Sequence, residues 1–245
     1  MARIFITGSA DGLGHLAAKQ LVNEGHQVVL HARNEKRGQE AMANVKGAEA
    51  VVTADLSVMK ETIQLADKVN ELGRFDAIIH NAGVYRSHES LIFKVNTLAP
   101  YILTCLIRKP KRLIYMSSGL HMSGNAELTG FDAGKVSYSD SKLHVVLLAK
   151  VVAGKWKGVY SNALDPGWVP TKMGGTGAPG NLKKGYETQV WLAVSEDKEA
   201  MVSGRYFYHQ KEKKYHPEAD NIKVQNKFLQ LCQSATDIKF PEFQM

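Results

Sequence analysis

The chain has few cysteines, no long hydrophobic run and no low-complexity linker, and each absence excludes a class of protein. Cys105 and Cys232 lie far apart in apolar surroundings and without metal-ligand spacing, which predicts reduced core residues and no metal site. The most apolar helical stretch, residues 143–153, is interrupted by Lys150, and no run reaches the roughly 18 apolar residues that a membrane span needs. We therefore expect neither a metalloprotein nor a membrane protein.

The basic surplus has no pattern typical of nucleic-acid binding. The net charge is +7, but lysine and arginine are spread through the sequence, with neither a basic arm nor a stacked aromatic array. The surplus favours solubility and attraction of a small anionic ligand. No targeting peptide precedes the apolar segment that starts at Ala2, which predicts a cytoplasmic protein.

Short apolar segments alternate with segments of helical periodicity. The expected strands are 2–7, 27–31, 50–54, 75–80, 111–116, 161–164 and 205–209. Helices are expected over 15–24, from 57, and over 89–107, 138–154, 186–195 and 221–234. Such alternation predicts an α/β fold, a single Rossmann-type doubly wound domain over residues 1–245, with a seven-stranded parallel sheet and helices on both faces.

A glycine-rich turn joins the first strand to the first helix. Glycines allow a sharp turn and a close approach of the backbone to a pyrophosphate, while the helix N-terminus offers unpaired N–H groups. The alternative is a tight turn without a ligand. The candidate cofactor residues are Thr7, Gly8, Ser9, Gly12, Leu13 and Gly14.

The ends of the next strands carry further candidates for a dinucleotide site. After the second strand, Arg33, supported by Arg37, stands where an acidic residue would bind ribose hydroxyls and an arginine would accept a 2′-phosphate, so NADP(H) is expected over NAD. Arg33 could instead be an ordinary helix-flanking cation. Asp55 and Leu56 are candidates for the adenine, although Asp55 could be a cap. Asn81, Ala82 and Gly83 are candidates for the wall beside the ribose, although Asn81 could stabilise its own turn.

A strand that ends in Ser117 and Ser118 precedes a helix that opens with Tyr138 and Lys142. Residues four apart lie on one helix face, so the phenol and the ammonium can share a site. A neighbouring cation favours the phenolate, which would bring the tyrosine towards acid–base chemistry. The same spacing also occurs by chance on solvated helices. Asn96, in the apolar middle of its helix, is either bonded locally or holds a water, since Pro100 should free a carbonyl nearby.

These motifs together resemble the short-chain dehydrogenase/reductase family over nearly the whole chain. The matches are Thr7 to Gly14 for T-G-x-x-x-G-x-G, Asn81-Ala82-Gly83 for N-A-G, Tyr138 to Lys142 for Y-x-x-x-K, and Pro166-Gly167 for P-G. Their order and separation are more specific than any one of them. The glycine spacing, unusual for a dinucleotide fingerprint, is the variant of this family.

The resemblance implies a catalytic tetrad of Asn96, Ser118, Tyr138 and Lys142. Tyr138 would donate the proton to a carbonyl oxygen that Ser118 orients. Lys142 would bind the nicotinamide ribose and lower the pKa of the phenol, and Asn96 would hold a water. The resemblance adds Pro166, Gly167, Val169 and Thr171 to the cofactor residues.

The resemblance also places the substrate region. Residues 171–185 would form a lid, although they could be a plain surface loop, and residues 120–137 would be an insertion beside the pocket, because Ser118 and Tyr138 are 20 positions apart. Trp168, Met173 and His121 are candidate substrate residues.

The expected function is NADPH-dependent reduction of a ketone or aldehyde, reversible as a secondary-alcohol dehydrogenase. The alternative is an NADP(H)-binding redox sensor without turnover, which would not need both Tyr138 and Lys142. We expect a small-molecule partner and a homodimer or homotetramer, because the apolar residues of 145–152 exceed what one buried face requires. The alternative is that this helix is buried within one subunit.

Overall fold

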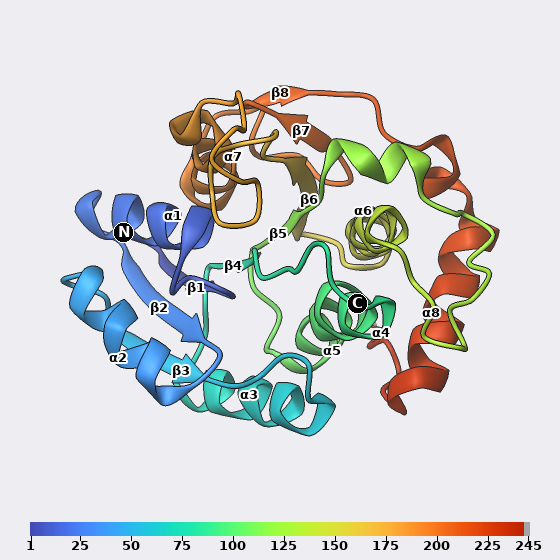
Figure 1. The fold of residues 1–245 in the computed structure, drawn as a ribbon, viewed down its shortest axis with the longest axis horizontal. Helices are drawn as coiled ribbons and strands as arrows, with labels where there is room; N and C mark the ends of the chain where they lie inside the picture. The colour runs from blue at the N-terminus through green and yellow to red at the C-terminus, as the bar shows by residue number, and fades with distance from the viewer. Residues whose placement is uncertain (243–245) are drawn as a thin grey trace.

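The computed structural model describes residues 1–242, and a continuous sheet runs through its centre (Figure 1). The strands are β1 (Arg3–Ile6), β2 (Gln27–Ala32), β3 (Ala50–Thr53), β4 (Ala77–His80), β5 (Arg112–Met116), β6 (Tyr160–Asp165), β7 (Tyr206–Tyr208) and β8 (Lys211–Glu212). Their order across the sheet is β3-β2-β1-β4-β5-β6-β7-β8. The predicted α/β class and the doubly wound sheet are confirmed.

The sheet has one strand more than the expected seven, and that strand is not parallel. β8 pairs antiparallel with β7 through Tyr208 and Lys211. The turn between them places His209 and Gln210 at φ values of 50° and 61°, the left-handed region that a two-residue hairpin turn requires at both positions. Neither residue is the glycine or asparagine that signals such a turn, and β8 is short, exposed and charged. The sequence pattern therefore gave no sign of it.

Helices cover both faces of the sheet (Figure 1). They are α1 (Gly12–Asn23), α2 (Glu35–Asn44), α3 (Met59–Glu71), α4 (Glu89–Ile92), α5 (Ala99–Leu106), α6 (Tyr138–Lys155), α7 (Leu182–Val194) and α8 (Ile222–Thr236), with short helical segments η1 (Phe93–Leu98), η2 (Gly119–Ser123) and η3 (Pro217–Asp220). On β1, Phe5 joins the core under α3, α5 and α6, while Ile4 and Ile6 join the core under α1 and α7. Burial on both faces explains the nearly continuous apolar strands.

The helix expected over 89–107 has an irregular centre. α4 and α5 are joined by η1, a π-helical segment in which the Ala99 N–H donates to the carbonyl of Lys94, five residues back. Pro100 has no N–H to donate to the Asn96 carbonyl one turn earlier, so the ordinary helical bond is missing there. The predicted loosening is present, and it places Asn96 at its centre.

The longest helix, α6, begins at the candidate catalytic tyrosine. Its start is fixed by a capping box, in which the Asp140 N–H donates to Ser137 Oγ (3.1 Å) and the Ser137 N–H donates to Asp140 Oδ2 (3.0 Å). The apolar side chains that seemed surplus are at most 4% exposed within the single chain, because η2, η3 and α8 pack against the helix. The argument for a dimer from this helix was wrong, and a dimer or tetramer stays a prediction without that support.

Candidate active site

The glycine-rich turn is joined to the loop after β4 by a network of short hydrogen bonds. Thr7 Oγ1 accepts from the backbone N–H groups of Asn81 and Ala82, both at 3.0 Å. Asn81 Nδ2 donates to the carbonyls of Thr7 (3.0 Å) and Gly8 (3.2 Å). A Cβ on Gly14 would stand 2.3 Å from Asn81 Nδ2, so only glycine fits there. Thr7, Gly14 and Asn81 thus shape the turn from beneath it.

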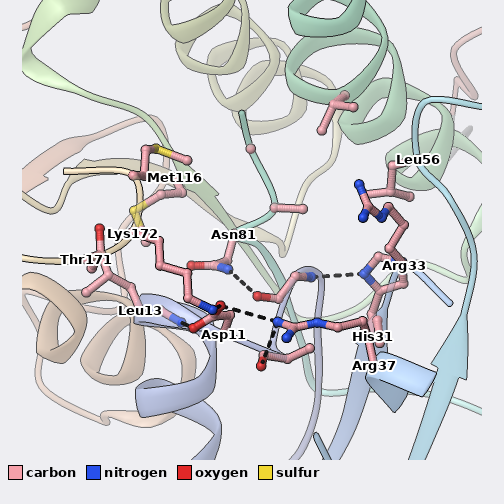
Figure 2. A pocket seen from close by; sticks show the side chains of 18 of the residues that line it. Asp11, Leu13, His31, Arg33, Arg37, Leu56, Asn81, Met116, Thr171 and Lys172 are labelled. Atoms are coloured by element: carbon pink, nitrogen blue, oxygen red, sulfur yellow. Dashed lines mark hydrogen bonds and ion pairs between the residues drawn. The ribbon is translucent and has the colours of Figure 1, made fainter. Parts of the chain in front are cut away.

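A cleft of about 570 Å³ opens above this turn at the carboxyl ends of the strands (Figure 2). Gly12 has a φ of +56° and nothing within 4 Å of where a Cβ would stand, so the turn leaves open room beside the N-terminus of α1. The predicted cofactor residues that line the cleft are Gly8, Gly12, Leu13, Arg33, Arg37, Asp55, Leu56, Asn81, Ala82, Gly83, Tyr138, Lys142, Pro166 and Thr171. An open glycine turn at a helix N-terminus, with cations at both ends of the cleft, fits a nicotinamide dinucleotide.

Five predicted cofactor residues do not line the cleft. Ser9 is fully buried, and its hydroxyl donates to the carbonyl of Ile6 (2.9 Å). Val169 is 4% exposed and packs beneath Gly180 and Gly185. Thr7 and Gly14 lie under the turn, as described above, and Gly167, a fifth, packs against the Tyr208 ring. These residues support the walls of the site.

His31 is a site residue that the sequence analysis missed. Its Nδ1 accepts the Gly8 N–H (3.0 Å), so the hydrogen stands on Nε2, which donates to the Ala54 carbonyl (3.1 Å). Burial lowers the pKa of His31 to about 4, which keeps the ring neutral in this tautomer. The ring therefore ties the glycine turn to the end of β3 (Figure 2). A polar histidine at the end of an otherwise apolar strand could have indicated that His31 belongs to the site.

The cations at the adenosine end of the cleft differ in their partners. Arg37 Nη2 lies 3.3 Å from Asp11 Oδ2, and its Nη1 lies 3.2 Å from Glu40 Oε2. Lys172, from the loop after β6, also pairs with Asp11 (Figure 2). Arg33 forms no ion pair with any residue of 1–242. Arg33 is therefore the cation left for an anionic ligand, and Arg37 neutralises the carboxylate of the glycine turn.

Asp55 acts as a turn and cap residue in this structure. Its Oδ1 accepts from the backbone N–H (2.9 Å) and the hydroxyl (2.7 Å) of Ser57. Its own N–H donates to Glu61 Oε2 (2.7 Å). The capping alternative thus describes its hydrogen bonds, although the residue still lines the cleft.

The two serines after β5 have different partners. The Ser117 hydroxyl is buried and donates to the carbonyl of Lys142 (2.8 Å). Ser118 is the serine whose hydroxyl interacts with the phenol of Tyr138. Ser118 Oγ also accepts the Leu120 N–H (3.3 Å) and caps η2. Ser117 lines the cleft and anchors α6 to the sheet, and contact of Ser118 with a ligand stays a prediction.

Tyr138 and Lys142 both line the cleft, and burial is the largest cause of the pKa shift of each side chain. Burial raises the pKa of Tyr138 to about 12, and the interaction with Ser118 only partly opposes this. The Lys142 ammonium donates to the Met116 carbonyl (2.9 Å) and lies 5.4 Å from the centre of the Tyr138 ring. Burial is the largest influence on the phenol pKa and the ammonium is bonded to a carbonyl, so the lowering of that pKa by Lys142 stays a prediction. Burial also lowers the pKa of Lys142 to about 8, against the opposing charge of Asp165.

Asn96 connects three elements of the site. Its Oδ1 accepts the Val84 N–H (2.8 Å), and its Nδ2 donates to the Val84 carbonyl (2.9 Å) and to Ser141 Oγ (3.1 Å). The side chain is 1% exposed, and both hydrogens of Nδ2 are used within the protein. Asn96 fixes the segment after Gly83 against α6; a water held near it stays a prediction.

The expected substrate residues divide into exposed and buried ones. Met173 lines the cleft, and Trp168 is 64% exposed with its Nε1 donating to the Gly174 carbonyl (2.8 Å). His121 was a wrong choice: it is 1% exposed, its Nδ1 donates to the Ser118 carbonyl (2.7 Å), and its Nε2 accepts the His216 N–H (3.2 Å). It holds the Ser118 backbone in place.

The expected lid is shorter than predicted. The irregular segment ends at residue 181, where Asn181 Oδ1 accepts the Lys184 N–H (3.0 Å) and caps α7. Gly185 lies inside that helix, packed against Val169 and Leu13. The predicted lid extended to Gly185 because a glycine is not typical of a helix, but Gly185 lies in the first turn of α7.

Within residues 1–242, no cluster of three or more His, Cys, Asp or Glu side chains is arranged to bind a metal ion. In the same range no helix combines the length and the apolar character needed to cross a bilayer. Cys105 and Cys232 are both free thiols.

The doubly wound sheet, the glycine turn and the cleft at the strand ends define a dinucleotide-binding oxidoreductase fold. Residues 2–180 match the family model for short chain dehydrogenases, and the chain belongs to this family. It is 44% identical to an uncharacterized oxidoreductase of Emericella nidulans, over 98% of this chain and 99% of that protein.

Solved structures share the fold. The chain superimposes with a TM-score of 0.80 on an uncharacterized protein from Mycobacterium paratuberculosis, at 21% identity and over 98% of this chain and 95% of the other. A short chain dehydrogenase from Burkholderia cenocepacia, solved in complex with NADP, gives a TM-score of 0.70 at 18% identity over 84% and 95% of the two chains.

Proposed function

We propose that the protein is an NADPH-dependent reductase of a ketone or aldehyde, running in reverse as a secondary-alcohol dehydrogenase. The observation that carries the proposal is that Tyr138 and Lys142 line the cleft that begins at the glycine turn, with the Ser118 hydroxyl interacting with the Tyr138 phenol. The phenol can supply a proton to a carbonyl oxygen and the hydroxyl can bind it, and the rest of the cleft, of about 570 Å³, offers a glycine turn and cations to a dinucleotide.

Bound NADPH would supply the hydride to the carbonyl carbon. Tyr138 supplies the proton to the carbonyl oxygen, and its pKa of about 12 means that the phenol carries this proton at neutral pH. Ser118 donates a hydrogen bond that orients the oxygen and stabilises its developing charge. The product is the alcohol, with one hydride and one proton added.

Lys142 and Asn96 hold the reacting groups in place. With a pKa of about 8, the Lys142 ammonium is mostly charged at neutral pH, and its bond to the Met116 carbonyl holds it on the lining of the cleft, where it would bind the nicotinamide ribose. The Asn96 amide holds the loop after Gly83 against α6, so the nicotinamide end of the cleft keeps its width.

The preference for NADPH rests on Arg33. Its guanidinium stands at the end of β2 on the lining of the cleft and is free of ion pairs within residues 1–242. A 2′-phosphate would supply the missing anion.

Turnover tests the proposal. Purified protein is mixed with NADPH or NADH and a panel of ketones and aldehydes, and absorbance of the reduced cofactor is followed. We expect oxidation of NADPH that falls by about 10²- to 10⁴-fold in Tyr138→Phe, because this variant loses the proton donor. If both proteins bind NADPH equally and neither consumes it with any carbonyl, the proposal fails and a redox sensor without turnover is favoured.

A further inference from the structure

Large exposed apolar side chains gather at the candidate active site. Within residues 1–242, nine large apolar residues are exposed, and five of them stand on the loops that follow β4, β5 and β6. The five are Tyr85 (38% exposed), Leu120 (47%), Met122 (49%), Trp168 (64%) and Met173 (44%). Single exposed apolar residues need no explanation, but a concentration of them marks a binding surface. We call these five residues the apolar rim.

The segments that carry the apolar rim emerge at the edge of the sheet where the reacting groups lie. β4, β5 and β6 are neighbouring parallel strands, so the loops after them emerge at one edge of the sheet (Figure 1). Ser118 stands directly before η2, which carries Leu120 and Met122, and Met173 lines the cleft beside Tyr138. Within the rim, Met173 lines the cleft and Tyr85 contacts Tyr138, so these two residues connect the rim to the cleft.

Tyr85 is the rim residue in direct contact with the candidate catalytic tyrosine. The two ring centres are 4.6 Å apart with an interplanar angle of 60°, an edge-to-face contact. The position of Tyr85 is fixed by its neighbour, because Asn96 binds both the N–H and the carbonyl of Val84. These bonds fix the backbone that precedes Tyr85, and 38% of Tyr85 is exposed.

We propose that Tyr85 is a specificity-determining residue and that the substrate is a large, flat, apolar carbonyl compound, such as an aryl ketone. The carbonyl reaches Ser118 and Tyr138, while the apolar body lies against Tyr85 and the rest of the apolar rim. Aromatic rings and the flexible thioethers of Met122 and Met173 suit a flat ligand of this kind. This inference rests on the proposed reductase function. Small ketones would not reach the apolar rim, so contacts with the rim would not strengthen their binding.

A series of methyl ketones with one reactive group and a growing apolar body tests the inference. The substrates are 2-butanone, acetophenone and 2-acetylnaphthalene, each with NADPH. The proteins are the wild type, Tyr85→Ala, Tyr85→Phe and the control Ile222→Ala, which removes an exposed apolar side chain at the start of α8. We expect kcat/KM of the wild type to rise along the series.

The variants separate contact with the substrate from support of Tyr138. In Tyr85→Ala, KM for 2-acetylnaphthalene should rise about three- to tenfold, and KM for 2-butanone less than about twofold, because one aromatic contact is lost. Tyr85→Phe and Ile222→Ala should behave as the wild type. A fall in kcat alone, equal for all three ketones, would show that Tyr85 only supports Tyr138 and would overturn the inference.

A binding measurement separates failure of the inference from failure of the proposed function. Saturation-transfer NMR follows 2-acetylnaphthalene with wild type and Tyr85→Ala in the presence of NADP⁺. Turnover of 2-butanone without preference for the larger ketones sinks the inference and leaves the reductase function intact. No turnover of any ketone, with binding of 2-acetylnaphthalene that depends on Tyr85, sinks the function and keeps the apolar site. No binding and no turnover sink both.

Discussion

The carboxylate of Asp165 lies close enough to Tyr138 and Lys142 to affect the pKa of both side chains. It ends β6, and its Oδ1 accepts the Gly167 N–H (2.8 Å). After burial and the opposing bond from Ser118, its charge raises the pKa of Tyr138 further, and it also raises the pKa of Lys142 against burial. Asp165 thus keeps both groups protonated, the form needed for reduction.

We predict that Asp165→Asn shifts the pH profile of alcohol oxidation to lower pH. Oxidation needs the phenolate, and loss of the charge lowers the pKa of Tyr138. The other groups that act on this phenol, Ser118 and Tyr85, are unchanged. The measurement is kcat/KM against pH in both directions, with exposed Asp67→Asn as control. An unchanged oxidation profile would show that the carboxylate has no influence on the phenol.

Arg33 should determine the preference for NADPH over NADH. In Arg33→Ala, KM for NADPH should rise by about tenfold or more, while KM for NADH stays within about twofold, because only NADPH carries the phosphate that the guanidinium would bind. Arg74→Ala, an exposed arginine before β4, is the matched control. Equal effects on the two cofactors would assign the preference elsewhere.

The π-helical segment η1 is the element that links the loop after β4 to α6. Asn96, inside η1, makes three hydrogen bonds from a nearly fully buried side chain. Its wide turn brings the amide to Val84 and Ser141 at once. Irregular helical turns of this kind recur at functional sites.

We predict that Asn96→Ala destabilises the fold and the site together. The substitution leaves the N–H and carbonyl of Val84 without partners, which costs about 2 to 4 kcal/mol of unfolding free energy. Urea unfolding measures this loss, and the loop after Gly83, freed from α6, should lower kcat. Ser141→Ala removes only one of the three bonds and should cost less; a cost equal to that of Asn96→Ala would contradict the role of Val84.

Strands with a continuous apolar segment can be predicted from the sequence, and a short charged strand cannot. The seven parallel strands were predictable because burial on both faces leaves continuous apolar segments, and the order of strand ends placed Arg33, Asn81, Ser118 and Pro166 at one edge. β8 was not, because two exposed charged residues have no apolar pattern. His31, Tyr85 and Asp165 were missed because their partners come from other elements, which one segment does not reveal.

Three buried histidines affect the stability of the whole molecule. Burial lowers the pKa values of His31 and His144 to about 4 and that of His80 to about 3, from 6.5. These histidines are neutral in the folded protein, whereas in the unfolded chain they become protonated below pH 6.5. They therefore stabilise the fold above that pH. Their contribution is lost as the pH falls towards 4.

We predict a steep acid destabilisation below pH 6.5. Three protons taken up only on unfolding correspond to a slope of about 4 kcal/mol per pH unit. His80→Phe, which keeps a ring against Tyr115, should reduce this slope by about one third. The test is urea unfolding of both proteins between pH 7 and pH 4.5. Identical slopes would mean that His80 is protonated in the folded state.

The burial of α6 has a consequence for motion. Tyr138 and Lys142 stand at the start of the helix that η2, η3 and α8 enclose, so the reacting side chains cannot loosen unless the centre of the protein opens. Amide hydrogens along α6 should therefore exchange with solvent only through global unfolding, whereas those of residues 171–180 exchange through local opening. We therefore expect the part of the cleft that Tyr138 and Lys142 line to be rigid, and the loop of residues 171–180, part of which also lines the cleft, to be the segment that moves.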